Sequence, residues 1–388
     1  MSFFKGTERL TDSFITEQEF VDAFIGGQLK NWGLNSLGSL GDNNTITRSS
    51  PVQTVAAGVN WVRIAGGGNA SGLKAGIKTD GTLWLWGGNA QGQLGNSTTI
   101  SRSSPIQTVS TGTNWRSICF NENFPIAIKT DGTLWLWGAN TCGRLGINTS
   151  VALFHSSPIQ TVATGTNWCA AAGGVNSVAA IKSDGTLWLW GINISGTLGT
   201  NNIVDRSSPV QTVATGTNWS KVGAESGGTS SAIKSDGTLW LWGGNGNGTI
   251  GDNSSINKSS PVQTVATGTN WKSVSSGNVT AGLKRDGTLW MWGLGSGGGL
   301  GDNSSINKSS PVQTIATGTN WKIASAGPTA VGGAIKTNGT LWLWGCNANG
   351  GLGDNSTINK SSPVQTVIGG TNWKSINPGS SSLALENC

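Results

Sequence analysis

A unit of about 50 residues recurs along this chain and limits what the chain can fold into. The proline of a Ser-Ser-Pro tripeptide returns every 50 to 54 residues, at Pro51, Pro105, Pro158, Pro209, Pro261, Pro311 and Pro363. A Trp-Gly pair recurs in the same rhythm, at Trp32, Trp86, Trp137, Trp190, Trp242, Trp292 and Trp344. A fixed period of this length is typical of solenoids, propellers and arrays.

All the tryptophans belong to the repeat. An Asn-Trp pair supplies Trp61, Trp115, Trp168, Trp219, Trp271, Trp321 and Trp373. A second tryptophan precedes six of the Trp-Gly pairs, at Trp84, Trp135, Trp188, Trp240, Trp290 and Trp342. These three series account for all 20 tryptophans, and the chain has no tyrosine. Their alternation within apolar segments predicts buried residues rather than an exposed stacking platform.

Each unit reads as four short strands. In residues 270–293, NWKSVSSG and TAGLK predict the first two strands, and Asp286-Gly287 predicts a tight hairpin turn into LWMWG. The third strand is apolar on both faces, which predicts burial on both sides, as between the stacked blades of a propeller. SSPVQTV predicts an outer strand that begins near a proline, where a missing N–H does least harm.

The two ends of the chain complement each other. The C-terminal part, 371–388, holds the first two strands of a unit, and GQLKNWG at 27–33 begins at the third. Together they complete one blade, which closes a ring and removes exposed sheet edges. The sequence therefore predicts an all-β, seven-bladed propeller of four-stranded blades over residues 28–388, with the last blade closed by strands from both termini.

The segment after each Trp-Gly pair carries a family resemblance. WGGNAQGQLG at 86–95 and WGCNANGGLG at 344–353 resemble the regulator-of-chromosome-condensation repeat, and the resemblance covers about residues 28–388. It implies the propeller fold. Members of this family include an exchange factor for a small GTPase that also binds nucleosomes, as well as chromatin readers, ligase modules and light sensors. The near-identity of the copies resembles bacterial and phage versions of the repeat.

This chain departs from the family pattern at two points. The family's usual histidine near the second strand is absent, and Gly295 replaces the motif asparagine in the sixth copy. No exchange-factor wedge can be assigned to any residue.

No group of residues indicates catalysis, a metal or a cofactor. The single histidine, His155, occupies a repeat position that holds arginine or lysine elsewhere. Gly-Asp-Asn-Ser-Ser at 251–255 and 301–305 resembles part of a calcium loop, but the copies at 95–99 and 199–203 lack the acid and no bidentate glutamate follows. The five cysteines have no ligand spacing. We expect a protein that is not an enzyme and needs no cofactor.

One repeat position is basic in nearly every copy and is the candidate binding site. It lies three residues before each Ser-Ser-Pro proline and comprises Arg48, Arg102, His155, Arg206, Lys258, Lys308 and Lys360. Equivalent positions of a propeller share a face, so we expect these residues to form a crown that docks an acidic partner. The alternative is a solvated loop residue copied with the unit. A second set, Lys78, Lys129, Lys182, Lys234, Lys284 and Lys336, is interpreted as solubilising lysines beside the hairpin turns.

Residues 1–27 differ in kind from the repeats and form a candidate adaptor. They carry two bases and five acids, a net charge of 2 − 5 = −3, against a total of +6 for the chain. Thr16 and Glu19 form a capping box that predicts a short helix. Its apolar residues and those before it are the expected anchor: Phe3, Phe4, Phe14, Phe20, Val21, Phe24 and Ile25. The segment either caps its own ring or binds another protein.

The layout of a small adaptor and a large symmetric body favours a structural or binding protein of a phage virion, concerned with assembly or host attachment. Its partners would be other virion proteins through residues 1–27 and an anionic receptor on the host surface. The sequence shows no signal peptide and no run of about 20 apolar residues, so we expect no membrane insertion. Its location would be the virion, or otherwise the cytoplasm.

Two rival functions remain open. One is a regulatory propeller that binds a small GTPase, chromatin or nucleic acid, with nucleic acid the less favoured partner. The other is a bacterial surface adhesin, which would need an export route that the sequence does not show.

Overall fold

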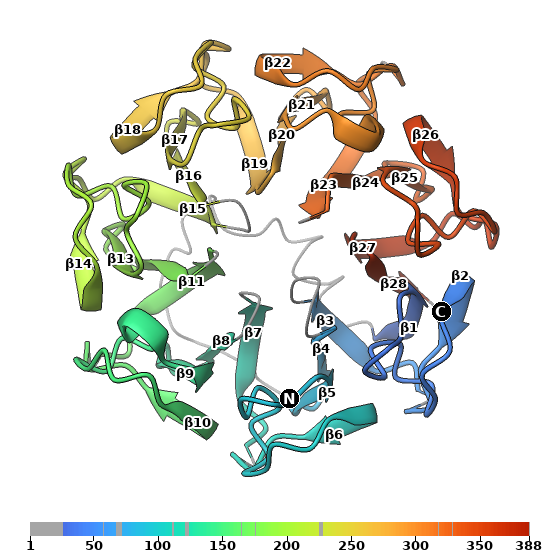
Figure 1. Cartoon of the computed structure of the whole chain (residues 1–388), viewed down its shortest axis with the longest axis horizontal. Coiled ribbons are helices and arrows are strands. Elements are labelled where there is room, and N and C mark those ends of the chain that lie inside the picture. Colours follow the sequence, from blue (N-terminus) through green and yellow to red (C-terminus); the bar gives the residue numbers. More distant parts are fainter. Residues whose placement is uncertain are drawn as a thin grey trace, which may run out of the picture.

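Strands pair into blades that surround one axis in the computed structural model of this chain (Figure 1). The model describes residues 26–387 except 57, 67–71, 111, 121–123, 164, 175, 225–227, 317 and 328. Each blade has four antiparallel strands, with the first nearest the axis and the fourth at the rim. Seven such blades confirm the predicted fold over the described part of the chain.

Six blades are continuous in sequence. Blade 1 has β3 (Trp61–Gly66), β4 (Lys74–Lys78), β5 (Leu83–Gly87) and β6 (Arg102–Gln107). Blade 2 has β7 (Trp115–Phe120), β8 (Pro125–Lys129), β9 (Leu134–Ala139) and β10 (Phe154–Gln160). Blade 3 has β11 (Trp168–Gly173), β12 (Ser177–Lys182), β13 (Leu187–Gly191) and β14 (Arg206–Gln211). Blade 4 has β15 (Trp219–Ala224), β16 (Thr229–Lys234), β17 (Leu239–Gly243) and β18 (Lys258–Gln263).

The remaining blades follow the same plan. Blade 5 has β19 (Trp271–Ser276), β20 (Val279–Lys284), β21 (Leu289–Gly293) and β22 (Lys308–Gln313). Blade 6 has β23 (Trp321–Gly327), β24 (Val331–Lys336), β25 (Leu341–Gly345) and β26 (Lys360–Gln365). Two single-turn 3₁₀ segments, η1 (Thr141–Gly143) and η2 (Ser296–Gly298), follow the third strands of blades 2 and 5.

Blade 7 is built from both ends of the chain, as predicted. It consists of β27 (Trp373–Asn377) and β28 (Ser381–Asn387) from the C-terminal part, followed by β1 (Gly27–Gly33) and β2 (Arg48–Gln53). β1 and β28 pair antiparallel from Gly27 opposite Asn387 to Gly33 opposite Ser381. This pairing closes the ring between blade 6 and blade 1 (Figure 1).

Tryptophans form the core between blades, as the sequence predicts. The Trp-Gly and Asn-Trp series are buried, because the third and first strands that carry them pack against neighbouring blades. Trp61 and Trp86 pack with ring centroids 6.2 Å apart, and Trp271 and Trp292 with centroids 6.1 Å apart. The third series, which includes Trp84, is half-buried.

The hairpin lysines are bound to these indoles, which corrects their interpretation as solubilising residues. Lys78 Nζ lies 5.1 Å from the ring centroid of Trp61 and 4.2 Å from that of Trp84. The same pair of cation–π contacts recurs at Lys129, Lys182, Lys234, Lys284 and Lys336. Each lysine therefore covers the indole edge of the core, and its charge interacts with ring faces rather than only with water.

The Asp-Gly turns are held by a short relay of hydrogen bonds. Asp80 Oδ1 accepts from the amide and the hydroxyl of Thr82, at 2.9 and 2.6 Å, and the Thr82 hydroxyl accepts from Trp84 Nε1 at 2.9 Å. The hydrogen bond from the Thr82 hydroxyl is the main reason that the pKa of Asp80 lies below its usual value. Gly81, with φ of +76°, leaves no room for a side chain, since a Cβ there would lie 2.0 Å from the carbonyl oxygen of Thr113.

The strand directions define two faces of the ring. The hairpin turns, the start of the first strand and the end of the fourth strand lie at one end of each blade, here called the turn face. The crown face is the opposite end, where the fourth strand begins. β1 enters blade 7 at the turn face, because Gly27 pairs with Asn387 while Gly33, at the other end, pairs with Arg48.

The predicted adaptor helix and its anchor residues Phe3, Phe4, Phe14, Phe20, Val21, Phe24 and Ile25 lie outside the described residues. Among the residues that are described, no helix has the length and apolar character needed to span a bilayer.

Candidate protein-binding face

The seven residues of the predicted crown occupy one structural position. Each lies at or beside the start of the fourth strand, opposite the glycine of the Trp-Gly pair: Arg48 opposite Gly33, Arg102 opposite Gly87, His155 opposite Gly138, Arg206 opposite Gly191, Lys258 opposite Gly243, Lys308 opposite Gly293 and Lys360 opposite Gly345. Equivalent positions in a ring of like blades share a face, so the structure brings these side chains to the crown face.

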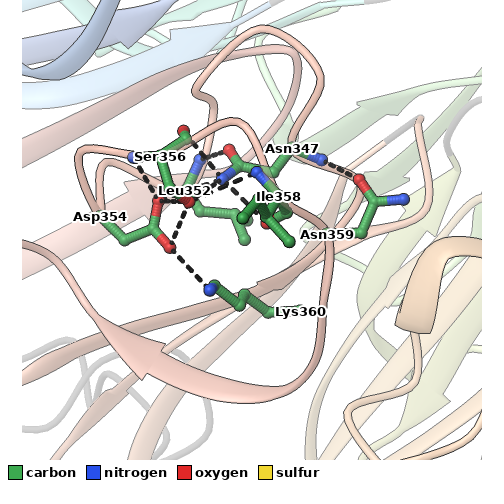
Figure 2. Close-up of polar contacts among 7 residues, drawn as sticks. All are labelled: Asn347, Leu352, Asp354, Ser356, Ile358, Asn359 and Lys360. Atoms are coloured by element: carbon green, nitrogen blue, oxygen red, sulfur yellow. Dashed lines mark hydrogen bonds and ion pairs between the residues drawn. The ribbon is translucent and has the colours of Figure 1, made fainter.

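A loop organised by the motif asparagine leads into each crown residue. In blade 6 the side-chain amide of Asn347 donates to Asp354 Oδ1 and to the carbonyl oxygens of Ser356 and Ile358, at 3.0, 3.0 and 3.2 Å (Figure 2). Its Oδ1 accepts from the amide of Leu352 at 2.9 Å. One buried side chain thus satisfies four polar groups of the loop, which explains the recurrence of asparagine in the repeat.

The same asparagine links the loop to the residue that precedes the crown lysine. The backbone amide of Asn347 donates to Asn359 Oδ1 at 2.8 Å, and Lys360 follows as the first residue of β26 (Figure 2). In blade 5, Gly295 replaces the asparagine, and the loop at Ile306 packs directly against this glycine. A Cβ at Gly295 would be 2.2 Å from the carbonyl oxygen of Ile306, so the loop there has adapted to glycine.

Four crown residues are paired with an aspartate of the preceding loop. The distances are 4.0 Å for Arg48–Asp42, 3.1 Å for Lys258–Asp252, 3.9 Å for Lys308–Asp302 and 3.7 Å for Lys360–Asp354. Sequence reasoning missed these pairs, although an aspartate six residues before the base was visible in all four copies. The crown is therefore not uniformly positive, because four of its charges are locally neutralised.

The other three crown residues have no such partner among the described residues. The loop position that holds aspartate elsewhere is Asn96 before Arg102, Ile147 before His155 and Thr200 before Arg206. Arg102 and Arg206 are exposed, whereas the four paired bases and His155 are half-buried. Because Arg102, His155 and Arg206 belong to blades 1, 2 and 3, the unpaired positions are adjacent around the ring (Figure 1).

A ring of exposed aliphatic side chains accompanies the crown, and sequence reasoning missed it. Its members precede the crown residues in the loops and are Ile46, Ile100, Val151, Val204, Ile256, Ile306 and Ile358. In six blades the carbonyl oxygen of this residue accepts from the motif asparagine, which fixes its position. The available signal was an isoleucine or valine that recurs in the loop of every copy, two residues before the crown residue in six of them.

Four of the five large apolar side chains that the described loops of the crown face expose in addition to this ring belong to blades 2 and 3, and the fifth is Leu37 of blade 7. An insertion in the blade 2 loop adds Leu153 and Phe154, and the loops of blade 3 add Ile194 and Ile203. Ile194 is 76% exposed. Apolar groups gathered on one part of a surface are typical of an interaction site.

The calcium-like loop uses its acid internally. Asp252 Oδ1 accepts from the amide and hydroxyl of Ser254, at 3.1 and 2.7 Å, and Oδ2 pairs with Lys258. Partial burial raises the pKa of Asp252, but the hydrogen bonds from Ser254 and Lys258 outweigh it and hold the pKa below its usual value. Across the described ranges, no cluster of three or more histidine, cysteine or acidic side chains could hold a metal ion.

The fold and the repeat loops identify the class of protein as a repeat propeller, and comparison with known proteins gives the family. The chain belongs to the RCC1-like domain family, whose model matches residues 28–384. This confirms the family resemblance that the repeat motifs carry.

Three curated relatives illustrate the range of that family. The ultraviolet-B receptor UVR8 of Arabidopsis thaliana is 27% identical over 246 residues, which cover 61% of this chain and 53% of the receptor. The mitochondrial RCC1 domain-containing protein RUG3 of the same plant is 28% identical over 227 residues, or 56% of this chain and 50% of RUG3. The human probable E3 ubiquitin-protein ligase HERC3 is 27% identical over 187 residues, which cover 47% of this chain and 17% of HERC3.

Two solved structures share the fold. Prp20p of Saccharomyces cerevisiae superposes with a TM-score of 0.83 at 17% identity, covering 97% of this chain and 96% of Prp20p. Human WBSCR16 superposes with a TM-score of 0.80 at 17% identity, covering 93% of this chain and 99% of WBSCR16. The chain spans about half the length of the plant relatives. All of these named proteins are eukaryotic, so they lend no support to the expected bacterial or phage type.

Proposed function

We propose that this chain is a non-enzymatic, protein-binding propeller whose crown face binds an acidic surface of another protein. The observation that carries the proposal is the coincidence, on one face, of seven basic or potentially basic positions and seven exposed aliphatic side chains. Charged groups around apolar anchors are the usual composition of a protein-binding patch.

The relatives support a binding role of this kind. The solved structure of Prp20p is described together with its binding properties to Gsp1p and histones, so one propeller of this fold works through protein contacts. Among our rival hypotheses, this favours a regulatory propeller over a virion component. The virion hypothesis then depends only on the layout of residues 1–27.

Residues 1–27 supply a second proposal, that the N-terminal segment anchors the ring to another protein. β1 begins at the turn face, seven residues of strand away from the crown. At about 3.3 Å per residue, the strand separates the two ends by roughly 20 Å. A segment that leaves from the turn face can hold a second protein while the crown face stays free, and capping of the ring at its turn face is the alternative.

A direct binding experiment tests the crown proposal. We would measure fluorescence anisotropy of a labelled poly-glutamate peptide titrated with the full chain, with a crown variant (Arg102→Gln, Arg206→Gln, Lys360→Gln) and with a turn-face variant (Lys272→Gln, Arg285→Gln, Lys322→Gln). The two variants lose the same charge from opposite faces. The crown variant should bind at least about tenfold more weakly, equivalent to about 1.4 kcal/mol, and the turn-face variant should bind as the parent does. Equal loss in both would contradict the proposal.

A nucleotide-release assay separates partner binding from exchange activity. The full chain is mixed with a small GTPase loaded with a fluorescent guanine nucleotide, and release is followed with time. Because no residue can be assigned to an exchange wedge, we expect the release rate to stay at its intrinsic value. Accelerated release would replace the binding proposal with an exchange-factor function.

A further inference from the structure

We propose that the partner docks on one sector of the crown face, over blades 1 to 3, and that the docked segment is an acidic peptide with large apolar side chains. This inference rests on the proposed binding function of the crown face and names the place and the partner chemistry. We call the site the open sector and define it by Arg102, His155 and Arg206 together with Leu153, Phe154, Ile194 and Ile203.

The charge pattern selects this sector. In blades 4, 5, 6 and 7 an aspartate lies 3.1–4.0 Å from the crown base, so an approaching carboxylate would have to compete with it. In blades 1 and 3 the corresponding residues are Asn96 and Thr200, which carry no charge. Arg102 and Arg206 are exposed and form no ion pair with a described acid, and a guanidinium is suited to bidentate contact with a carboxylate.

Apolar exposure selects the same sector. Leu153, Phe154, Ile194 and Ile203 are all additions to the common ring of aliphatic residues, and all belong to blades 2 and 3. At the positions of Ile203 and Ile194, blade 4 has Ser255 and Gly246. Large apolar side chains on the partner would be needed to remove this surface from water, so a purely acidic partner would leave most of it exposed.

The parts of the open sector are contiguous because the loops of neighbouring blades interlock. The amide of Ser97, in the blade 1 loop, donates to the carbonyl of Ser156, next to His155, at 2.8 Å. The amide of Asn148, in the blade 2 loop, donates to the carbonyl of Ser207, next to Arg206, at 2.9 Å. The blade 2 loop that carries Phe154 therefore lies between the two arginines.

Among the described residues, three other charged groups belong to these blades at this end of the strands. Lys74 is buried at the seam with blade 7, where it donates to the carbonyl of Ser381. Asp205 is exposed beside Arg206, but its Oδ1 accepts from the backbone amide of Asn193 at 2.7 Å, as a loop residue does in other blades. Arg144 is buried against the ring of Phe124, 5.7 Å from its centroid, and donates to the carbonyl of Thr141. The described residues thus leave two exposed arginines and one constrained aspartate, a sector of net positive charge.

The test introduces an aspartate in blades 1 and 3, at the loop position that holds aspartate in blades 4 to 7. In Asn96→Asp/Thr200→Asp the new carboxylates take positions whose side chains already accept from the motif asparagines, at 3.3 Å in both blades, so the loops should keep their structure. The matched control, Ser255→Asp/Thr357→Asp, adds the same charge to exposed positions of the crown face in blades 4 and 6. The probe is a fluorescein-labelled peptide in which glutamates alternate with leucine and phenylalanine, titrated with the full chain.

We expect the probe to bind, Asn96→Asp/Thr200→Asp to weaken binding at least about tenfold, and the control to change it by less than about twofold, because charges more than about 8 Å away are screened at physiological salt. A Phe154→Ser/Ile194→Ser/Ile203→Ser variant should also weaken binding, as should a probe with serine for leucine and phenylalanine. These three side chains are exposed, so the variant should fold normally, which its thermal unfolding checks.

The contrary outcomes separate the two proposals. If both aspartate pairs weaken binding equally, the crown face binds without a preferred sector, and this inference fails while the proposed function stands. If poly-glutamate binds as tightly as the alternating peptide and the serine variant binds normally, the apolar part of the inference fails. If no acidic peptide binds, the proposed function fails as well. Tight binding of a short DNA duplex that depends on Arg102 and Arg206 would overturn the choice of a protein partner.

Discussion

The indole of Trp32 donates a hydrogen bond of 2.7 Å to the carbonyl oxygen of Gly351, which lies 319 residues away in sequence. Trp32 belongs to the third strand of blade 7, and Gly351 belongs to the loop of blade 6. The same bond joins every other blade to its predecessor: Trp86 to Ser39, Trp137 to Gln93, Trp190 to Arg144, Trp242 to Thr197, Trp292 to Thr249 and Trp344 to Gly299. One indole per blade therefore both fills the core and connects adjacent blades around the full ring.

Removing the bond at the closure should destabilise the whole ring. Trp32→Phe keeps an aromatic ring but removes the indole N–H, so that the Gly351 carbonyl keeps only the hydrogen bond from the Ser382 hydroxyl, at 2.7 Å. The expected cost is that of one hydrogen bond, about 0.5–1.5 kcal/mol. The measurement is urea unfolding of the full chain, followed by tryptophan fluorescence. Trp84→Phe is the comparison, because Trp84 donates only within its own hairpin, to Thr82. A smaller loss for Trp32→Phe than for Trp84→Phe would contradict this role of the closure bond.

Lys74 makes the stability of the chain depend on pH. Its side chain is buried at the seam between blades 1 and 7, where Nζ donates to the carbonyl of Ser381 at 2.7 Å, and it forms no ion pair with any described acid. Burial lowers the pKa of Lys74 to about 7. The unfolded chain keeps this proton to about pH 10, so folding releases it above pH 7 and the free energy of unfolding rises with pH there. Below about pH 7 the full cost of the buried charge is present.

Thermal unfolding at pH 6.5 to 8.5 measures this effect. The parent should gain stability across that range, and Lys74→Met should show a flatter profile. The variant should also be the more stable of the two near neutral pH, because methionine fills a similar volume without a charge. Parallel profiles for both proteins would show that Lys74 does not carry the pH dependence.

We expect the motif asparagine to stabilise the loops that form hydrogen bonds with it and to destabilise the blade 5 loop, which has glycine at this position. Asn245→Ala removes the acceptor for Ile250 and the donor to Asp252 and Ile256, which should cost about 2–3 kcal/mol through unsatisfied buried groups. Gly295→Asn inserts a side chain where a Cβ would lie 2.2 Å from the Ile306 carbonyl oxygen, so it should also destabilise. Urea unfolding of each single variant measures both; stabilisation by Gly295→Asn would show that the blade 5 loop has kept the common geometry.

The fold could be predicted from the sequence because short segments of each repeat predict its strands and turns. The Asp286-Gly287 turn, the apolar third strand and the complementary terminal fragments each predict a part of the blade, and the pairing of β1 with β28 follows from the last of these. The crown positions followed from their equivalence in the repeat, and the structure places them on one face. Whether that face binds a partner stays a prediction.

The contacts that sequence reasoning missed join residues across strands or loops. Lys78 was interpreted as a solubilising residue, because only the register of β3 against β4 shows that it lies opposite Trp61. The ion pair of Lys258 with Asp252 depends on a loop whose path is set by Asn245. The exposed position of Ile256 was missed because the side chain carries neither a charge nor a catalytic group, although an isoleucine or valine recurs two residues before six of the seven crown residues.

Hydrogen–deuterium exchange of the full chain, with and without the alternating glutamate and apolar peptide, tests the central claim most directly, because it reports where on the ring a partner binds. The account predicts slower exchange on binding in the loops at 96–102, 148–155 and 200–206, with little change in the equivalent loops at 252–258 and 354–360. Protection at the hairpin turns of the turn face, such as 80–82 and 286–288, or equal protection in all crown loops, would contradict it.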